Sequence, residues 1–311
     1  MVQFSLFRLP CRLFAFLAAL VAAGCAAPAM QGQSLPAPGP SSSPQSTQPG
    51  AVPLSTDDAW LQKTGSLYYS TAKAGLGGFD CAVHPDWRTL FSSVDAGTPV
   101  SSNDARILLL ESVRINLHAH MQGGSTLDWS PGSGSGKPLD QDSSALLSKM
   151  RQATEQTLEG FLQFWTPFVD GSVVPQSAKG LTITHDGSLH RIHAEESDTA
   201  LTETFSSDVL EHFDVNMNGI SIKFQPAYRP TGQGLLVKSF QAHVQPAGVP
   251  ADRAEEMRVD IEYQTLDGFP IPARLNMETT NTGQFNFVLD GCTVSRLQKP
   301  EPAYEVKPAL Q

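Results

Sequence analysis

The chain has 311 residues and a formal net charge of −10 at pH 7. An acidic chain is not drawn to nucleic acid or to anionic lipid headgroups by long-range attraction, so we expect no nucleic-acid partner. No Pro/Ser-rich linker or internal repeat divides residues 56–297, which we interpret as a single domain.

The first 24 residues have the layout of a secretory signal peptide. Arg8 and Arg12 provide a basic start, and Leu13–Ala23 is an uncharged apolar run that ends in small residues. The run is shorter than the roughly 20 apolar residues that span a bilayer, which argues against a transmembrane anchor. Removal of residues 1–24 takes away both arginines and moves the net charge from −10 to −12.

The residues at the end of this signal carry a resemblance. Ala22–Gly24 lead directly into Cys25, and this pattern resembles the lipobox of bacterial lipoproteins. The resemblance implies cleavage before Cys25 and attachment of acyl chains such as palmitate to that cysteine. Ala26 follows where Asp would retain a lipoprotein at the inner membrane, which implies an outer-membrane anchor facing the periplasm. The alternative is ordinary cleavage at Ala27–Ala29, which would release the protein.

Residues 25–55 are predicted to form a tether. Residues 26–55 contain no charged side chain, and 30–53 are mostly Pro, Gly, Ser, Gln and Ala. Such a segment buries too little apolar surface to offset the entropy of ordering, so we expect it to be disordered and semi-extended. Residues 298–311 are expected to be a flexible tail.

Two cysteines remain for the folded part. Cys11 lies in the signal and Cys25 is the predicted lipidation site, which leaves Cys81 and Cys292. In an oxidising envelope compartment we expect these two to pair, and the alternative is two buried free thiols. In the chain-entropy model, a disulfide closing so long a loop is worth roughly 5 kcal/mol.

The start of the domain is predicted to be helical. Thr56–Asp58 places acidic groups at a helix N-terminus, and apolar residues recur at helical spacing to Thr71, with an end near Gly75–Gly78. A short helical turn is expected after His84-Pro85, and a further short helix from Asn103 to Leu110.

The pattern changes at Val113. Apolar and polar residues alternate from there to Met121, which predicts a half-buried strand, and Ser125–Trp129 is expected to return as its hairpin partner. The stretch 131–138 contains Gly136-Lys137. It lacks the first glycine and the final hydroxyl of a phosphate loop, so we interpret it as a flexible loop.

The long segment from Ser143 or Ser144 to Phe168 is predicted to be a helix. Large apolar side chains recur every three or four residues, and Pro167 is expected to end or kink it. The stripe can be read as core packed on a sheet, or as the lining of a cavity with Phe161 and Trp165 facing a ligand.

Nine strands are predicted after residue 180. They are Leu181–Thr184, Leu189–Ala194, Ala200–Phe205, Leu210–Met217, Ile220–Gln225, Leu235–Val244, Arg258–Thr265, Phe269–Thr279 and Gln284–Val294. Asn218-Gly219 and Asp267-Gly268 favour the tight turns that join antiparallel strands. Pro270 and Pro272 place their strand at an edge or at a bulge.

These elements predict an α+β fold. We expect a large curved antiparallel sheet, a half-open barrel, covered by one long and one or two shorter helices. So large a meander has to curl over its apolar face, and the long aromatic helix is expected to fill the concave side.

No residue pattern indicates catalysis or metal binding. His118 and His120 share the polar face of one strand but lack a third ligand, so we interpret them as solvent-facing. Glu195-Glu196 and Glu255-Glu256 are adjacent pairs beside turns, for which a solvated role is expected. We therefore predict a protein that is not an enzyme and has no cofactor or metal.

The whole arrangement resembles the LolA/LolB-like lipoprotein-carrier fold over about residues 56–297. Val259–Tyr263, Leu266–Gly268 and Phe269–Pro272 are similar to the late hairpin of those domains. The resemblance implies a hollow that binds acyl chains or other apolar ligands without a cofactor.

Two functions are therefore considered: an envelope lipoprotein that binds a hydrophobic ligand, and a structural or interaction lipoprotein with a packed core that acts through protein partners. The candidate cavity residues are Phe161, Trp165, Phe168, Phe213, Met217, Phe224, Tyr263 and Phe285.

Overall fold

A computed structural model describes residues 55–94, 100–101, 103–121, 124–131, 140–171, 173–196, 198–250, 253–280 and 283–297. The predicted signal peptide 1–24, the predicted lipidation site Cys25 and the predicted tail 298–311 lie outside the described residues, as do residues 26–54 of the tether and loop residues 132–139. Within the described residues, no helix combines the length and the apolarity needed to cross a membrane.

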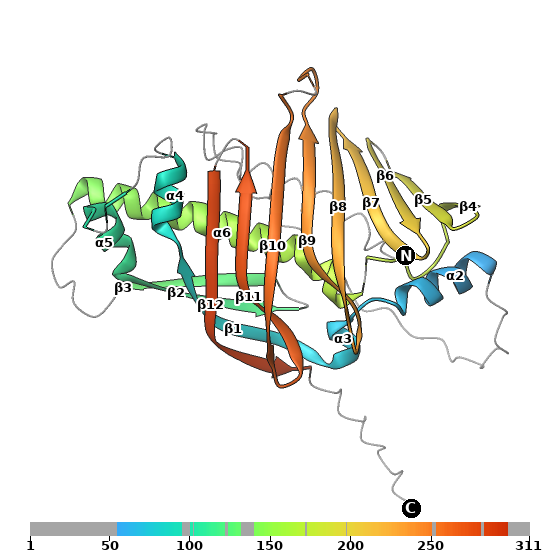
Figure 1. The fold of residues 1–311 in the computed structure, drawn as a ribbon, viewed down its shortest axis with the longest axis horizontal. Coiled ribbons are helices and arrows are strands. Elements are labelled where there is room, and N and C mark those ends of the chain that lie inside the picture. The colour runs from blue at the N-terminus through green and yellow to red at the C-terminus, as the bar shows by residue number, and fades with distance from the viewer. Residues whose placement is uncertain are drawn as a thin grey trace, which may run out of the picture.

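In the described residues, twelve antiparallel strands form one curved sheet that does not close, with β3 and β4 at its edges (Figure 1). The order is β3-β2-β1-β12-β11-β10-β9-β8-β7-β6-β5-β4, so β4 to β12 follow the chain and β1 joins the last strand. The strands are β1 (Leu76–Pro85), β2 (Val113–His120), β3 (Gly124–Pro131), β4 (Thr182–Asp186), β5 (Leu189–Glu196), β6 (Thr199–Ser206), β7 (Val209–Met217), β8 (Ile220–Thr231), β9 (Gly234–Gln245), β10 (Glu255–Leu266), β11 (Phe269–Thr279) and β12 (Gly283–Arg296).

Five helices occur in the described part of the chain, and the longest runs across one face of the sheet (Figure 1). They are α2 (Thr56–Gly65), α3 (Thr71–Ala74), α4 (Trp87–Val94), α5 (Ala105–Glu111) and α6 (Gln141–Asp170). In Figure 1, α4 and α5 lie at one end of α6, and α2 lies at the other end beside β4 to β6. The predicted fold class, a large curved antiparallel sheet with one long helix, is confirmed.

The turn dipeptides define the meander as predicted. Asn218 and Gly219 have φ values of 50° and 77°, and Asp267 and Gly268 have 49° and 87°. Two consecutive positive φ values match the twist of a tight hairpin, which Asn-Gly and Asp-Gly adopt at little cost. All nine predicted strands after residue 180 are present, with ends that differ by at most three residues except in β8, which continues six residues beyond the predicted Gln225.

The prolines of β11 lie at a bulge inside the sheet. Glu262 of β10 is paired with Arg274, whereas the next residue, Tyr263, is paired with Pro272. The skipped residue between them absorbs the irregularity that two prolines without N–H groups impose on a ladder. Of the two positions expected for this strand, the bulge is confirmed, since β11 is paired on both sides.

Strand β1 was not predicted, and the expected helix from Thr56 to Gly75 is broken. Helix α2 ends at Gly65, and residues 67–69 exchange backbone hydrogen bonds with Leu235 of β9 before the short helix α3. Gly78 was interpreted as part of a helix stop. A Cβ there would lie 2.4 Å from the carbonyl oxygen of Ala119, so the glycine allows β1 to approach β2 closely.

The expected helix boundaries also need correction. Asp104 caps α5 in place of Asn103, and Asp140 caps α6 in place of Ser143 or Ser144. Pro167 lies inside α6, which continues to Asp170. Pro167 removes one backbone donor, and Thr166 bonds its hydroxyl to the carbonyl of Leu162 in the same turn.

Candidate functional site

The hollow of the sheet contains aromatic side chains from α6. Phe161, Trp165 and Phe168 are each 0% exposed. Phe168 lies 6.4 Å from Phe213 of β7 and 6.0 Å from Phe224 of β8, measured between ring centroids. The helix residues and the strand residues therefore form one packed cluster, which fills the space that was considered as a cavity.

Two aromatic residues of this cluster were missed. Phe164 lies 4.1 Å from Phe224 and 4.5 Å from Phe240, centroid to centroid, so its contacts are closer than those of Phe168. Phe164 lies three positions after Phe161 and four before Phe168, so it shares their side of the helix and was omitted only because the stripe was followed through Trp165. The available signal was the absence of any charged residue from Gly160 to Val169, which favours deep burial of this part of the helix.

Trp165 also anchors α6 through a polar contact. Its Nε1 donates a hydrogen bond of 2.9 Å to the hydroxyl of Tyr263 on β10, and that hydroxyl donates one of 2.6 Å to the carbonyl oxygen of Val237 on β9. Burial raises the pKa of Tyr263 far above its usual value. The chain of bonds satisfies both buried polar groups and fixes α6 against two central strands.

The remaining two candidates also belong to the core or pack against it. Met217, at the end of β7, is 6% exposed, and Phe285 of β12 is partly buried against the core. All eight candidates therefore contact the protein's own core, and a role for any of them as a ligand contact stays a prediction.

Cys81 and Cys292 form a disulfide between β1 and β12, as expected. The bond spans 211 residues of sequence and joins neighbouring strands with a Cα–Cα distance of 4.1 Å. Gln264 of β10 donates its side-chain N–H to Cys292 Sγ and to the carbonyl oxygen of Leu289, at 3.2 Å and 3.1 Å. The disulfide therefore holds the N-terminal strands onto the meander.

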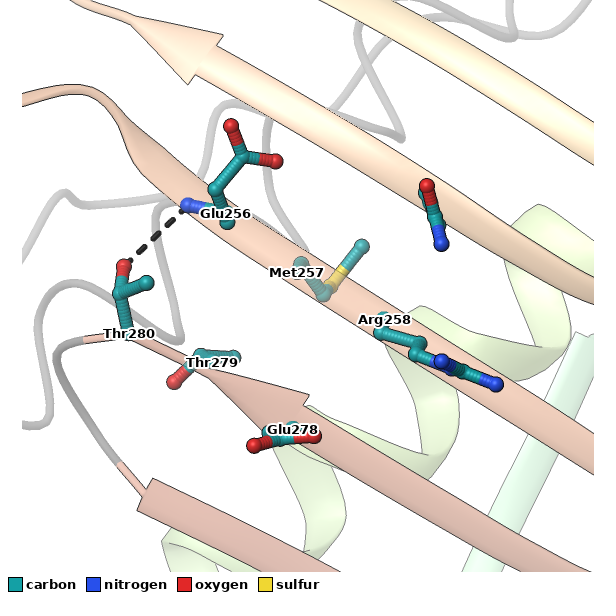
Figure 2. A pocket seen from close by; sticks show the side chains of 7 residues that line it. Glu256, Met257, Arg258, Glu278, Thr279 and Thr280 are labelled. Carbon is teal, nitrogen blue, oxygen red and sulfur yellow. Dashed lines mark hydrogen bonds between the residues drawn. The ribbon is translucent and has the colours of Figure 1, made fainter. Parts of the chain in front are cut away.

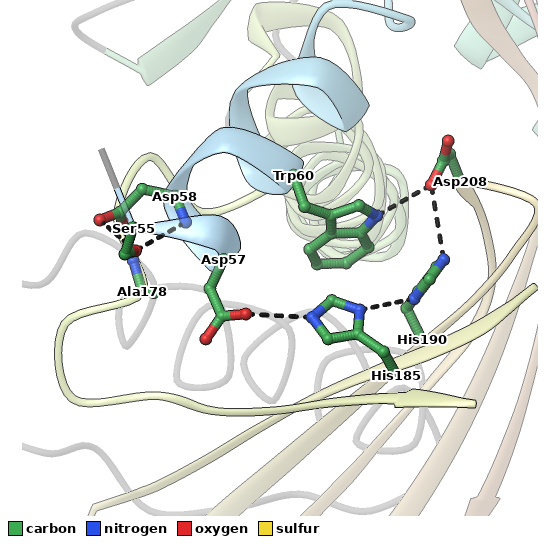
Figure 3. Close-up of polar contacts among 8 residues, drawn as sticks. All are labelled: Ser55, Asp57, Asp58, Trp60, Ala178, His185, His190 and Asp208. Atoms are coloured by element: carbon green, nitrogen blue, oxygen red, sulfur yellow. Dashed lines mark hydrogen bonds and ion pairs between the residues drawn. The ribbon is translucent and has the colours of Figure 1, made fainter. Parts of the chain in front are cut away.

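A polar cluster, which we call the His–Asp cluster, links α2 to the sheet (Figure 3). It consists of Asp57 of α2, His185 of β4, His190 of β5 and Asp208 of the turn between β6 and β7. Trp60 of α2 donates its Nε1–H to Asp208 Oδ1 at 2.8 Å. Nothing in the sequence interpretation identified this cluster.

Asp208 occupies a strained turn. Ser207 and Asp208 have φ values of 49° and 66°, a left-handed conformation that two consecutive residues with side chains rarely adopt. The strain is compensated by the contacts of the carboxylate, because Lys63 Nζ lies 2.7 Å from Asp208 Oδ2. Hydrogen bonds from Lys63 and Trp60 lower the pKa of Asp208.

One carboxyl group, on strand β6, is buried. Glu203 of β6 is 4% exposed, and its Oε2 has no hydrogen-bond partner. Burial raises the pKa of Glu203 to about 8. Glu255, expected to be solvated, is also buried at 7% exposure, which corrects that expectation.

A shallow hollow of about 280 Å³ lies on the outer face of the sheet (Figure 2). Its lining comes from β9 to β11 and the loop after β11: Gln241, Glu256, Met257, Arg258, Glu278, Thr279 and Thr280. Arg258 pairs with Asp260 at 2.8 Å, and Glu256 accepts a contact from His243 Nδ1 at 2.5 Å. Glu256 and Arg258 are thus engaged by their own neighbours, and a lining this charged is unsuited to an apolar ligand.

The histidines of the outer face pair with carboxylates. His118 Nδ1 lies 2.6 Å from Asp80 Oδ1, and its Nε2 lies 3.3 Å from Asp128 Oδ2. The hydrogen bond with Asp80 raises the pKa of His118. Across the described ranges, no three His, Cys, Asp or Glu side chains are arranged to hold a metal ion.

The comparisons with known proteins add no relative. No protein family, curated protein or solved structure matches this chain.

Proposed function

We propose that the protein is a lipid-anchored protein of the bacterial envelope whose folded domain acts by contact with other proteins and not by catalysis. The N-terminal pattern that ends in Cys25 supports the anchor and the location. The observation that carries the second part of the proposal is that α6 itself fills the hollow of the sheet with Phe161, Phe164, Trp165 and Phe168.

The size of the buried surface supports this function over ligand binding. A large apolar side chain contributes roughly 1.5–3 kcal/mol when it is fully buried. Those four rings and Leu158 are all between 0% and 2% exposed, which places the packing of α6 on the order of 10 kcal/mol. A ligand bound at micromolar affinity supplies only about 8 kcal/mol. Displacement of α6 by such a ligand would also remove most of the stability that a domain of this size normally has.

The exposed surface fits polar contacts with a partner. In the described part of the chain, only Leu108 and Val288 are large apolar residues with clear exposure, at 52% and 37%. The outer face of β9 to β11 instead presents alternating acidic and basic side chains such as Glu256, Arg258 and Glu278. A partner on this face would be bound through hydrogen bonds and charge complementarity.

The experiment that tests this proposal uses the full-length protein in mild detergent. Brominated fatty acids quench the fluorescence of a tryptophan that they contact, and Trp165 is fully buried in the hollow beside Phe161. We expect quenching to be the same in the wild type and in a Trp165→Phe variant, because no acyl chain reaches the hollow. Quenching that saturates in the wild type and is lost in the variant would replace this proposal by the apolar-ligand carrier that the LolA/LolB-like resemblance implies.

A further inference from the structure

Strand β6 turns one carboxyl group toward the inside of the sheet. Glu203 is paired with Ile192 of β5 and with Phe213 of β7, so its neighbours on both adjacent strands are apolar. The residue is 4% exposed, and its Oε2 has no hydrogen-bond partner among the described residues. Ionisation of Glu203 in this position is unfavourable, because neither water nor a donor stabilises a negative charge on that oxygen.

The first helix and the residues that follow it lie over this part of β6. Phe205 is two positions after Glu203 on the same face of the strand, and Trp60 of α2 packs edge-on against it at 5.5 Å between ring centroids. The Tyr68 hydroxyl accepts the backbone N–H of Leu210, the residue paired with Phe205, at 2.7 Å. Burial, and less strongly the nearby charge of Glu203, raises the pKa of Tyr68 to about 12. The segment from Trp60 to Tyr68 therefore covers the buried carboxyl.

Polar side chains fasten α2 to the sheet (Figure 3). Asp208 of the β6–β7 turn accepts hydrogen bonds from Trp60 Nε1 at 2.8 Å and from Lys63 Nζ at 2.7 Å. Asp57 Oδ1 lies 3.0 Å from Nε2 of His185 on β4. Contacts between side chains that are partly exposed to water add little stability each, so this attachment is weaker than the packing of α6.

Helix α2 can leave the sheet without breaking a strand ladder. In the described part of the chain, backbone-to-backbone hydrogen bonds from this region to a strand begin at residues 67–69, which bond with Leu235 of β9. A bend near Ser66 would therefore release α2 alone. Only Leu61 and Thr64 of α2 are buried, whereas α6 is buried along most of its second half. Of the two helices, α2 is thus the one that can open locally.

Two tyrosines and one carboxylate near Glu203 keep their charge state between pH 5 and pH 9. Tyr68 and Tyr228 of β8 stay neutral, because burial raises the pKa of both hydroxyls well above the usual value. Asp208 stays ionised, because the hydrogen bond from Lys63 lowers its pKa. These groups therefore do not titrate together with the buried carboxyl.

Two histidines also face α2. The rings of His185 on β4 and His190 on β5 lie 5.3 Å and 4.9 Å from the ring of Trp60, centroid to centroid, and His185 contacts Asp57. Histidine ordinarily titrates in the same pH range, so a test has to separate these rings from the buried carboxyl. Helix α6 contributes no ionisable side chain between Gly160 and Val169.

We propose that α2 is a pH-dependent cover of the inner face of β6, closed while Glu203 keeps its proton and released increasingly as the pH rises from 5 to 8. When α2 is open, water surrounds Glu203, which then ionises as an ordinary glutamate does. When α2 is closed, the pKa of Glu203 is about 8 instead of 4.5. The closed state is therefore favoured most below pH 4.5, and its ratio to the open state falls about tenfold per pH unit until about pH 8. Release uncovers the rings of Trp60 and Phe205 and adds the residues of α2 to the predicted tether.

Hydrogen–deuterium exchange of the full-length protein between pH 5 and pH 9, corrected for the intrinsic rate, tests the proposal. Exchange in peptides of α2 should accelerate about tenfold per pH unit from pH 5 to 8, level off above that, and stay faster than exchange in α6. Glu203→Gln, which keeps the shape of the protonated carboxyl, should remove this pH dependence. Glu196→Gln, at an exposed position of β5, should retain it.

Three results would overturn the proposal: exchange in α2 that is no faster than in α6, exchange in α2 that does not vary with pH in the wild type, or the same pH dependence in Glu203→Gln. The last result would assign the effect to His185 and His190, which that variant retains. If Glu203→Gln does not fold, infrared spectra of the wild type decide. The absorbance of a protonated carboxyl group should be present at pH 6 and lost by pH 9, and its absence at pH 6 would contradict the proposal.

Discussion

Trp165 of α6 and Tyr263 of β10 are joined by a hydrogen bond of 2.9 Å inside the aromatic cluster. The indole N–H has this hydroxyl as its acceptor, and the hydroxyl passes its own proton to the carbonyl oxygen of Val237. Because both ends are buried, removal of the central hydroxyl leaves a donor and an acceptor without partners.

Tyr263→Phe is expected to lower the free energy of unfolding by about 1–3 kcal/mol, which is the cost of buried unsatisfied polar groups. Urea-induced unfolding followed by circular dichroism measures this change. Tyr69→Phe is the matched control, because the Tyr69 hydroxyl is buried without a partner and its removal should be neutral or stabilising. Equal losses in the two variants would contradict the role assigned to the Trp165–Tyr263 bond.

Glu203 should make the stability of the domain depend on pH. Its pKa in the folded protein is about 8, above the 4.5 of an unfolded chain, so the folded state holds the proton more tightly. The contribution of Glu203 is therefore fully favourable below pH 4.5, and stability falls as the pH rises from 4.5 to about 8. The expected slope for one proton is about 1.4 kcal/mol per pH unit.

Glu203→Gln removes this titration. The difference in unfolding free energy between variant and wild type should grow in favour of the variant as the pH rises from 5 to 8. Glu196→Gln, an exposed carboxyl one strand away, controls for the change in net charge. A difference that stays constant with pH would show that Glu203 is ionised in the folded protein.

The disulfide should stabilise the domain strongly. Replacement of Cys81 and Cys292 together by Ala is expected to lower the free energy of unfolding by roughly 2–5 kcal/mol, because the unfolded chain loses a long-range constraint. Thermal unfolding with and without a thiol reductant measures the effect. The reductant should shift the wild type toward the double variant and leave the double variant unchanged; a shift in both would point to another cause.

Cys25→Ser tests the predicted anchor. We expect this variant to lose labelling by radioactive palmitate and to leave the membrane fraction. Cys11→Ser, a change inside the signal peptide, should keep both properties. Palmitate labelling that persists in Cys25→Ser would exclude Cys25 as the lipidation site.

The sequence predicted the meander well because its signals are local. Alternating residues and dipeptides such as Asn218-Gly219 act within a few positions of the chain. The missed strand β1 depends on distant partners. Position 78 needs a glycine because the backbone of Ala119 on β2 approaches it closely, and residues 76–85 alone do not show this contact. Its glycines instead matched the rule for the end of a helix.

The His–Asp cluster could be predicted only in part. A tight turn centred on Asp186-Gly187 would pair His185 with Ser188. The turn lies one residue later, so that Asp186 pairs with Leu189 and His185 with His190. Asp57 and Asp208 are more than 120 residues from each other in sequence. Asp57 reaches His185 through the packing of α2, and Asp208 reaches His190 through the β6–β7 turn. Neither contact can be predicted from periodicity along the chain.

The order of the strands has a consequence for how the protein is made. Strands β4 to β12 each pair with a chain neighbour, so this part can form by successive hairpins as it is synthesised. Strand β1 must wait for β12, and Cys81 for Cys292, more than 200 residues later. The first three strands can pair with one another, but the open edge of β1 stays unpaired until the C-terminal strand has arrived. A chain that is exported before it folds has the time to do so, and truncation near the C-terminus would leave its N-terminal strands without a sheet to join.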